Sequence, residues 1–202
     1  MSAQRDQSFG YENLSIIDKF GVYLSTLKIK KYIPKTKTCK ILDLGCGFNA
    51  TLITNLHKEI KTGIGIDILV NKEIMIPNIK LVESSIEGAY EMLQGEKFDI
   101  ISMISVLEHL ENPLYNLRKC FELLESRGLL LVNVPTWLGK YFLEFSAFKL
   151  GLSPSCEMND HKMYYNISDL WPLLIKAGFL PINLKLNYHK FGLNLFAVAK
   201  KE

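Results

Sequence analysis

The stretch "ILDLGCGFNA", residues 41–50, carries two glycines one residue apart, directly after an apolar run that contains an aspartate. Glycine allows backbone conformations, and a close approach of a ligand to the main chain, that a Cβ would block. Read as G-x-G-x-x-A, the stretch is typical of a dinucleotide-binding turn. Read from Asp43 as D-x-G-x-G, it is typical of another kind of nucleoside-binding turn. The stretch by itself leaves both interpretations open.

Apolar runs typical of strands alternate with helical patterns on both sides of this stretch. Strands are expected at residues 40–45, 62–68, 78–84, 98–104 and 128–135. Helices are expected over residues 11–33, 49–60 and 86–94, from the Asn112 cap and Pro113 to Gly128, and from a Ser168 cap to Ala177 with Pro172 near its first turn. This alternation predicts a mostly parallel sheet with helices on both faces.

The C-terminal end departs from the alternation. After Pro135 comes an aromatic-rich insert, residues 136–166, and the chain ends with two strand-like runs joined by a short turn near residues 190–192. So short a connection requires an antiparallel pair. The expected fold is therefore α/β, a Rossmann-like, doubly wound sheet of seven strands, mostly parallel with an antiparallel C-terminal hairpin. We expect residues 1–202 to form one domain, with residues 1–37 as an N-terminal helical cap.

Composition excludes several classes of protein. The net charge of +3 is too small for a nucleic-acid-binding surface, and the lysines between residues 28 and 40 are interpreted as a solvated face. The four cysteines form no C-x-x-C pair, so no metal site is expected. The N-terminus is polar, and no apolar run is long enough to span a membrane. These features predict a cytoplasmic protein without a membrane span.

Two aspartates narrow the choice of ligand. Asp67 ends the second expected strand, 20 residues after Gly47, where a carboxylate can accept hydrogen bonds from both hydroxyls of a ribose. Both templates share that feature. Asp43, two residues before Gly45, would repel a pyrophosphate but suits a cationic amino-acid group. A long leading segment and the final hairpin also differ from a dinucleotide-binding unit.

From about residue 38 to residue 200, the chain resembles the class I S-adenosylmethionine-dependent methyltransferases, in their small-molecule subgroup. The motifs that resemble the family are "LDLGCG" (42–47), "GIDI" (65–68), "SSIE" (84–87), "FDIISMISVLEHLENP" (98–113) and "LLESRGLLLVNVP" (123–135). The resemblance implies S-adenosylmethionine as cofactor, bound by Asp43, Gly45, Cys46, Gly47, Asp67, Ile68, Ser85, Ile86 and Ser105. Two positions depart from the family pattern: Asn49 stands where a third glycine is common, and Ser85 stands where an aspartate is common.

The resemblance implies methyl transfer to an oxygen, nitrogen or carbon of a small-molecule or saccharide acceptor. The candidate catalytic residues are His161 and His109. The candidate acceptor contacts are Glu108, Asp160, Tyr164, Tyr165, Trp137 and Tyr141. The insert at 136–166 would then lie on the acceptor side, and its apolar segment 137–152 is a lid, a core helix or an interface. The alternatives are a non-catalytic cofactor-binding module and, on G-x-G-x-x-A alone, a nicotinamide-dependent oxidoreductase.

Overall fold

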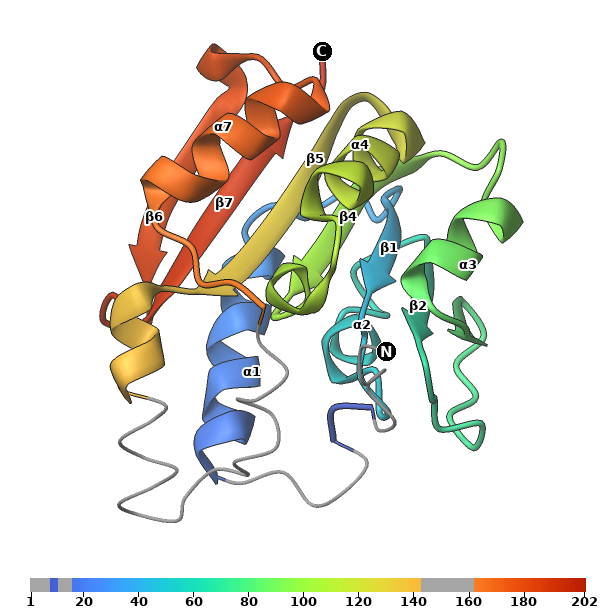
Figure 1. The fold of residues 1–202 in the computed structure, drawn as a ribbon. Coiled ribbons are helices and arrows are strands. Elements are labelled where there is room, and N and C mark those ends of the chain that lie inside the picture. Colours follow the sequence, from blue (N-terminus) through green and yellow to red (C-terminus); the bar gives the residue numbers. More distant parts are fainter. Residues whose placement is uncertain (1–7, 11–15, 143–161) are drawn as a thin grey trace. The chain divides into compact units, whose positions relative to one another are not determined.

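The computed structural model describes residues 8–10, 16–142 and 162–202 of the chain, drawn in Figure 1. They belong to two compact units, Met1–Ser102 and Met103–Glu202. The seven strands have the order β3-β2-β1-β4-β5-β7-β6. The chain runs from β1 outward to β3 and then reverses direction in the strand order at β4, which is the pattern of a doubly wound α/β sheet. The predicted fold class is confirmed.

The N-terminal unit contains the parallel strands. Its elements are α1 (Ile16–Lys30), β1 (Lys40–Leu44), α2 (Thr51–Asn55), β2 (Thr62–Asp67), β3 (Ile79–Glu83), α3 (Ile86–Met92) and the first part of β4 (Phe98–Ile104). Strand β2 pairs in parallel with β1 and with β3. The carboxyl ends of parallel strands lie at one edge of a sheet, so the loops after these three strands lie at the same edge. Their predicted strand character is confirmed.

The C-terminal unit contains the antiparallel strands. Its elements are η1 (Leu107–His109), α4 (Pro113–Leu123), β5 (Leu124–Pro135), α7 (Ile167–Ala177), η2 (Pro181–Asn183), β6 (Leu184–His189) and β7 (Asn194–Lys200). Strand β7 pairs antiparallel with both β5 and β6, so the predicted hairpin is confirmed. Next to α4 and α7, the rings of Phe121 and Phe179 meet edge to face with centroids 5.0 Å apart.

The helix predicted over residues 49–60 is much shorter in the structure. Helix α2 ends at Asn55, although Leu56 and Ile60 are still buried. After Asn55 the backbone N–H groups of Leu56 and Glu59 donate three residues back, to Ile53 O and Leu56 O, so the segment continues as turns. The side-chain Nδ2 of Asn78 donates to two carbonyl oxygens of this segment at 2.8 and 3.2 Å and gives them a partner from outside it.

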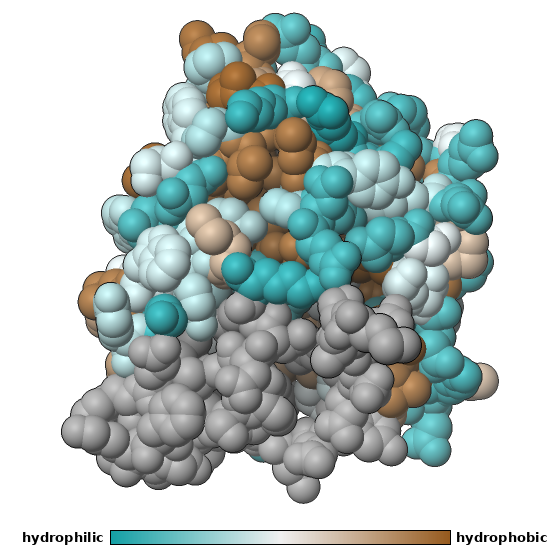
Figure 2. Space-filling model, viewed as in Figure 1, coloured by the Kyte–Doolittle hydropathy of each residue, from teal (hydrophilic) through white to brown (hydrophobic). Residues whose placement is uncertain are grey.

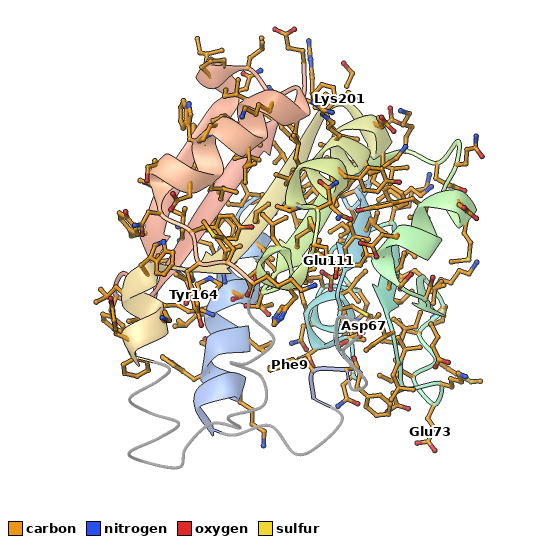
Figure 3. All side chains as sticks on the ribbon, viewed as in Figure 1. Phe9, Asp67, Glu73, Glu111, Tyr164 and Lys201 are labelled. Carbon is orange, nitrogen blue, oxygen red and sulfur yellow. The ribbon has the colours of Figure 1, made fainter. Side chains whose placement is uncertain are left out.

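The predicted end of α4 at Gly128 is wrong. The helix ends at Leu123, and β5 begins directly after it, so Gly128 lies inside a strand. The Nζ of Lys201 donates to the carbonyl oxygens of Phe121 and Leu124, at 2.7 and 2.9 Å. A cation at a helix C-terminus is favourable for the helix dipole, and this one comes from the far end of the chain, labelled in Figure 3.

The predicted Ser168 cap of α7 is also wrong. The N-cap is Asn166, whose backbone N–H donates to Asp169 Oδ2 at 2.8 Å. Pro172 accordingly lies inside the helix rather than near its first turn. The Asn112 cap of α4 is confirmed, because its side-chain oxygen accepts from a backbone N–H of the first turn at 3.0 Å.

A turn at the start of the insert is fastened to the β6–β7 turn. Residues 137–142 are helical, and Thr136 Oγ1 accepts from the N–H of Gly139 at 3.0 Å. The same hydroxyl donates to the carbonyl of Gly192 at 2.7 Å, while the backbone N–H of Thr136 donates to Leu193 O at 3.0 Å. Thr136 therefore caps this helix and anchors it to the hairpin at once.

Replacing Gly139 with alanine should destabilise the protein by about 2 kcal/mol, because the new Cβ would lie 2.1 Å from the carbonyl oxygen of Leu193. Thermal unfolding measures the loss. Gly95→Ala is the matched control: its φ of +85° costs conformational strain, but a Cβ there meets nothing within 4 Å. Equal losses in the two variants would contradict the close backbone approach at Gly139.

The surface alternates in character. On the face drawn in Figure 2, hydrophobic residues form separate groups between hydrophilic ones.

Within the described ranges, no helix has the length and apolarity needed to cross a membrane.

Candidate functional site

The glycine loop after β1 is held in an open conformation by main-chain bonds. Gly45 and Gly47 both have positive φ values, 72° and 75°, which favour glycine. The N–H groups of Gly45 and Cys46 donate to Ile66 O at 2.8 and 3.0 Å. Strand β2 thus fixes the loop directly, as the sequence spacing of the two motifs required.

Asp67 joins the loop to the end of β2. Its Oδ2 accepts from the N–H of Gly47 at 2.8 Å, and its Oδ1 accepts from the N–H of Ile68 at 2.9 Å. Oδ1 also accepts from the hydroxyl of Ser8 at 2.6 Å. The structure therefore brings together the predicted Gly47, Asp67 and Ile68, and adds Ser8, which the sequence did not indicate.

Asp43 is a buried carboxylate with one satisfied oxygen. It is 2% exposed, and Ser102 Oγ donates to its Oδ1 at 2.7 Å. In the described part of the chain, its Oδ2 is buried and has no hydrogen-bond partner. Burial raises the pKa of Asp43 to about 7; the Ser102 hydrogen bond opposes that rise and the charge of Asp67 adds to it. Such a group favours a cationic, hydrogen-bond-donating ligand.

Cys46 has a packing role in this loop. Its Sγ lies so close to β2 that a Cβ on Gly65 would be 3.1 Å from it. Burial raises the pKa of the Cys46 thiol, and the charges of Asp43 and Asp67 raise it further. A thiol kept protonated in this way is a poor nucleophile, so the packing role suits Cys46 better than a covalent one.

Ser85 caps the helix after β3. Its Oγ accepts from the N–H of Gly88 at 3.0 Å, and Ile86 begins α3 directly after it. The hydroxyl keeps its own proton and one further acceptor position for a ligand. The neighbouring Ser84 donates its N–H to Asp67 O at 2.9 Å, so the predicted adenine-side residues are tied to the predicted ribose-side residue.

At Asn49, where a third glycine is common in the family, the left-handed conformation belongs to the next residue. Ala50, not Asn49, has the left-handed conformation, with φ 43° and ψ 40°. The Asn49 side chain is instead used for hydrogen bonds: Nδ2 donates to Gly10 O at 3.2 Å, and Oδ1 accepts from Asn71 Nδ2 at 3.2 Å.

In the C-terminal unit, the predicted Ser105 and Glu108 follow β4. Ser105 has a φ of 56° and is exposed, and its N–H donates to Asn133 O at 2.8 Å. Glu108 lies in η1 and is 1% exposed. Its carbonyl accepts from the N–H groups of Lys162 and Met163 at 2.8 and 3.3 Å, so the end of the insert is fastened to η1. His109 ends η1 and is half-buried.

Aromatic side chains of the insert gather around a lysine. The rings of Trp137 and Tyr164 have centroids 5.6 Å apart. Lys140 Nζ lies 5.9 to 6.0 Å from the ring centroids of Trp137, Tyr141 and Tyr164. Trp137 and Tyr141 are 40% and 65% exposed, so the described part of this segment is not a core helix. The rest of segment 137–152, and with it Asp160 and His161, lies outside the described residues.

Two buried polar side chains of this unit have atoms without hydrogen-bond partners among the described residues. Tyr165 is 1% exposed with an unpaired hydroxyl, and Asn133 is fully buried with both amide atoms unpaired. Burial raises the pKa of Tyr165 to about 12, and the charges of Glu108 and Asp169 raise it further. Asn133 was not predicted as a site residue. The signal for it was a single polar residue within the apolar run "LLLVNVP".

Metal ligands are not gathered anywhere in the ranges 8–10, 16–142 and 162–202: no group of three or more His, Cys, Asp or Glu side chains could hold a metal ion there.

Comparisons with known proteins agree with this geometry. A family model described as "Methyltransferase domain" matches residues 11–183. A ubiquinone biosynthesis O-methyltransferase of Dinoroseobacter shibae is 26% identical over 159 residues, covering 74% of this chain and 63% of that relative. The chain thus spans about three fifths of the length of this curated relative.

Solved structures share the fold. A SAM-dependent methyltransferase from Archaeoglobus fulgidus superposes with a TM-score of 0.66 at 19% identity, covering 91% of this chain and 97% of that one. The plantazolicin methyltransferase BpumL, solved with a desmethyl-plantazolicin analogue and SAH, superposes with a TM-score of 0.66 at 15% identity, covering 91% and 85%.

Proposed function

The chain belongs to the methyltransferase-domain family, and on that premise we propose that it transfers the methyl group of S-adenosylmethionine to a small-molecule acceptor. The resemblance stated from the motifs is confirmed at the level of the family. The single observation that carries the proposal is Asp43. A buried carboxylate with an unpaired oxygen, beside a glycine loop, suits the cationic amino-acid end of this cofactor and would repel a pyrophosphate.

The residues of the N-terminal unit fit the cofactor group by group. Asp43 would hold the ammonium group, and the open Gly45–Gly47 loop would lie under the amino-acid and ribose parts. Asp67 would accept from the ribose, and Ser85 and Ile86 would contact the adenine. When bound, the cofactor supplies a methyl group already activated on a sulfonium. The chain must then orient the acceptor and exclude water, and needs a base only if the acceptor loses a proton.

The acceptor contacts that we propose lie in the C-terminal unit. They comprise the predicted Glu108, Trp137, Tyr141, Tyr164 and Tyr165, with Asn133 added, while Ser105 stays a proposed cofactor contact. Unpaired buried polar atoms at Asn133 and Tyr165 support a polar acceptor, because leaving such atoms without a partner costs free energy. The curated relative named above is an O-methyltransferase, so a hydroxyl is the first acceptor group to test and a saccharide hydroxyl the second.

Direct binding and turnover test the proposal. Calorimetry should show S-adenosylmethionine binding to the purified chain, and a panel of hydroxylated small molecules and sugars should give S-adenosylhomocysteine as product. No heat of binding at millimolar cofactor would refute the proposal. Binding with no turnover across the panel would favour the non-catalytic module.

His161→Ala and His109→Ala should lower kcat without changing cofactor affinity, and an unchanged kcat in both would remove them as catalytic candidates.

Replacing Asn133 with leucine should raise the free energy of unfolding by about 1–2 kcal/mol, because the substitution removes two buried polar atoms without partners. The same change should lower kcat/KM for the acceptor by about tenfold, because one acceptor hydrogen bond is lost. Urea unfolding and steady-state kinetics measure the two effects. Asn187→Leu on the exposed part of β6 is the control and should change neither. A destabilised Asn133 variant would show that the amide has partners and is structural.

The oxidoreductase alternative is disfavoured by the surroundings of a candidate catalytic pair. Tyr115 and Lys119 have a Tyr-x-x-x-Lys spacing, which hydride chemistry can use. However, Tyr115 is 42% exposed on α4, and Lys119 pairs with Glu122 at 2.9 Å. Added NADH should therefore show no fluorescence transfer from the protein. We also propose the cytoplasm as the compartment, since Cys39, Cys46 and Cys120, the cysteines of the described ranges, form no disulfide.

A further inference from the structure

Residues 8–10 lie across the glycine loop as a short segment, here called the strap. Three hydrogen bonds hold the strap: Ser8 Oγ donates to Asp67 Oδ1, the N–H of Phe48 donates to Phe9 O at 2.8 Å, and Asn49 Nδ2 donates to Gly10 O. Ser8 is only 5% exposed. Figure 3 labels Phe9, the middle residue of the strap, and Asp67, which accepts from Ser8.

The strap lies directly against the loop that the cofactor needs. A Cβ on Gly47 would lie 2.9 Å from Phe9 O and 3.5 Å from a ring carbon of Phe9. The strap therefore already needs a glycine at position 47, before any ligand is considered. The strap therefore rests beside the Asp67 carboxylate, which accepts from the N–H of Gly47.

Counting acceptor positions on Asp67 shows that the strap and a ribose compete. A carboxylate offers about four lone-pair positions, two on each oxygen. Oδ1 already accepts from Ile68 and Ser8, and Oδ2 accepts from Gly47. One position is left, while the two hydroxyls of a ribose need two. Only the Ser8 hydroxyl can leave without breaking the main-chain geometry of the loop.

Asn49 gives the strap an anchor that the usual glycine could not give. Its Oδ1 accepts from Asn71, which turns its Nδ2 toward the carbonyl of Gly10. A glycine at this position would make neither bond. The departure from the family pattern at Asn49 is thus accounted for by the strap.

We propose that Ser8 and the cofactor ribose compete for Asp67, with Asn49 anchoring the strap, so that Ser8 sets the affinity for the cofactor. The inference rests on the proposed binding of S-adenosylmethionine. Cofactor binding moves the Ser8 hydroxyl off Asp67 while the contacts of Phe9 and Gly10 keep the strap on the loop. Ser8 and Asn49 are in this sense residues that determine cofactor affinity without touching the transferred group.

Calorimetry with S-adenosylhomocysteine tests the competition. Ser8→Ala should bind it about threefold to tenfold more tightly than the unchanged protein, since one net hydrogen bond no longer has to be broken. Asn49→Gly should shift affinity in the same direction. Ser126→Ala, a matched change in the C-terminal unit, should have no effect. An unchanged or weaker affinity of Ser8→Ala would overturn the inference.

An analogue with one ribose hydroxyl separates competition from a general loosening of the loop. The 2′-deoxy analogue of S-adenosylhomocysteine needs only the one acceptor position that Asp67 has left. Ser8→Ala should therefore gain nothing for this analogue, and an equal gain for both ligands would overturn the inference. If the unchanged protein binds neither ligand, the proposed function fails; if it binds both and Ser8→Ala behaves identically, only the competition fails.

Discussion

Replacing Asp67 with alanine should lower the affinity for S-adenosylmethionine by about 100-fold or more, because two charge-assisted hydrogen bonds to the ribose are lost. Asp67 also holds the glycine loop through the N–H of Gly47 at 2.8 Å, so part of the loss comes from a less ordered loop. Calorimetry measures the change in affinity. The released strap works in the opposite direction, but by only about one net hydrogen bond, so the loss dominates.

Two variants make the Asp67 result interpretable. Asp67→Asn keeps the shape and one oxygen acceptor, so it loses one of the two main-chain bonds but should still fold, and it should lose most of the affinity. Glu73→Ala removes an exposed carboxylate from the loop after β2 and should leave binding unchanged. Circular dichroism of all three variants separates lost binding from lost folding. Near-normal binding by a folded Asp67→Ala would exclude Asp67 from the cofactor site.

The strands could be predicted from the sequence because their signal is local. The run "FDIISMI" coincides with β4, and the turn near residues 190–192 joins β6 to β7 as expected. Burial of a sheet on both faces makes its strands continuous apolar runs, and such runs are visible without knowledge of their neighbours.

Two helix ends could not be predicted from nearby residues, whereas the Asn112 cap of α4 could. Carbonyls at the end of α4 accept from Lys201, and carbonyls of the segment after α2 accept from Asn78. No pattern near either helix contains that information. At Gly128 the sequence offered a plausible local stop signal, but the helix ends at Leu123, where a lysine more than seventy residues away donates to the nearby carbonyls.

The candidate site divides in the same way. Asp67 and Gly47 were predicted together, because their 20-residue spacing reflects one strand–helix–strand unit, and they are hydrogen-bonded. Ser8 and Ser102 were missed, since each meets its aspartate from 59 residues away along the chain. The strap in particular has no motif: its main-chain carbonyls carry two of its three contacts, and any residue type could supply them.

Asp43 should make the stability of the free protein depend on pH. Its pKa is about 7 in the folded chain against an ordinary 3.8, so the folded state holds a proton that the unfolded state has released between those values. Unfolding stability must therefore fall as the pH rises from about 4 to 7, and the ionised, buried group costs about 4 kcal/mol once the pH is above 7.

Asp43→Asn should remove that dependence, because an amide does not ionise. At pH 8 we expect the free energy of unfolding of the variant to be about 2 kcal/mol higher than that of the unchanged protein. The gain is smaller than the full cost of the ionised group, because the amide N–H group that replaces the unpaired oxygen is itself a buried donor. At pH 5 the two proteins should be nearly equal, because Asp43 is then protonated in the fold. Urea unfolding across this range measures the difference, and parallel pH profiles would contradict the buried, ionisable Asp43.

The same substitution should have the opposite effect on cofactor binding. An ammonium group beside Asp43 favours its ionised form, so the affinity for S-adenosylhomocysteine should rise by up to about tenfold per pH unit below pH 7 and level off above it. Asp43→Asn should bind weakly and without this rise, while Glu73→Gln should follow the unchanged protein. A variant that gains stability and loses affinity would show that Asp43 serves ligand binding and lowers the stability of the free protein. A variant that keeps its affinity would place the ammonium group elsewhere.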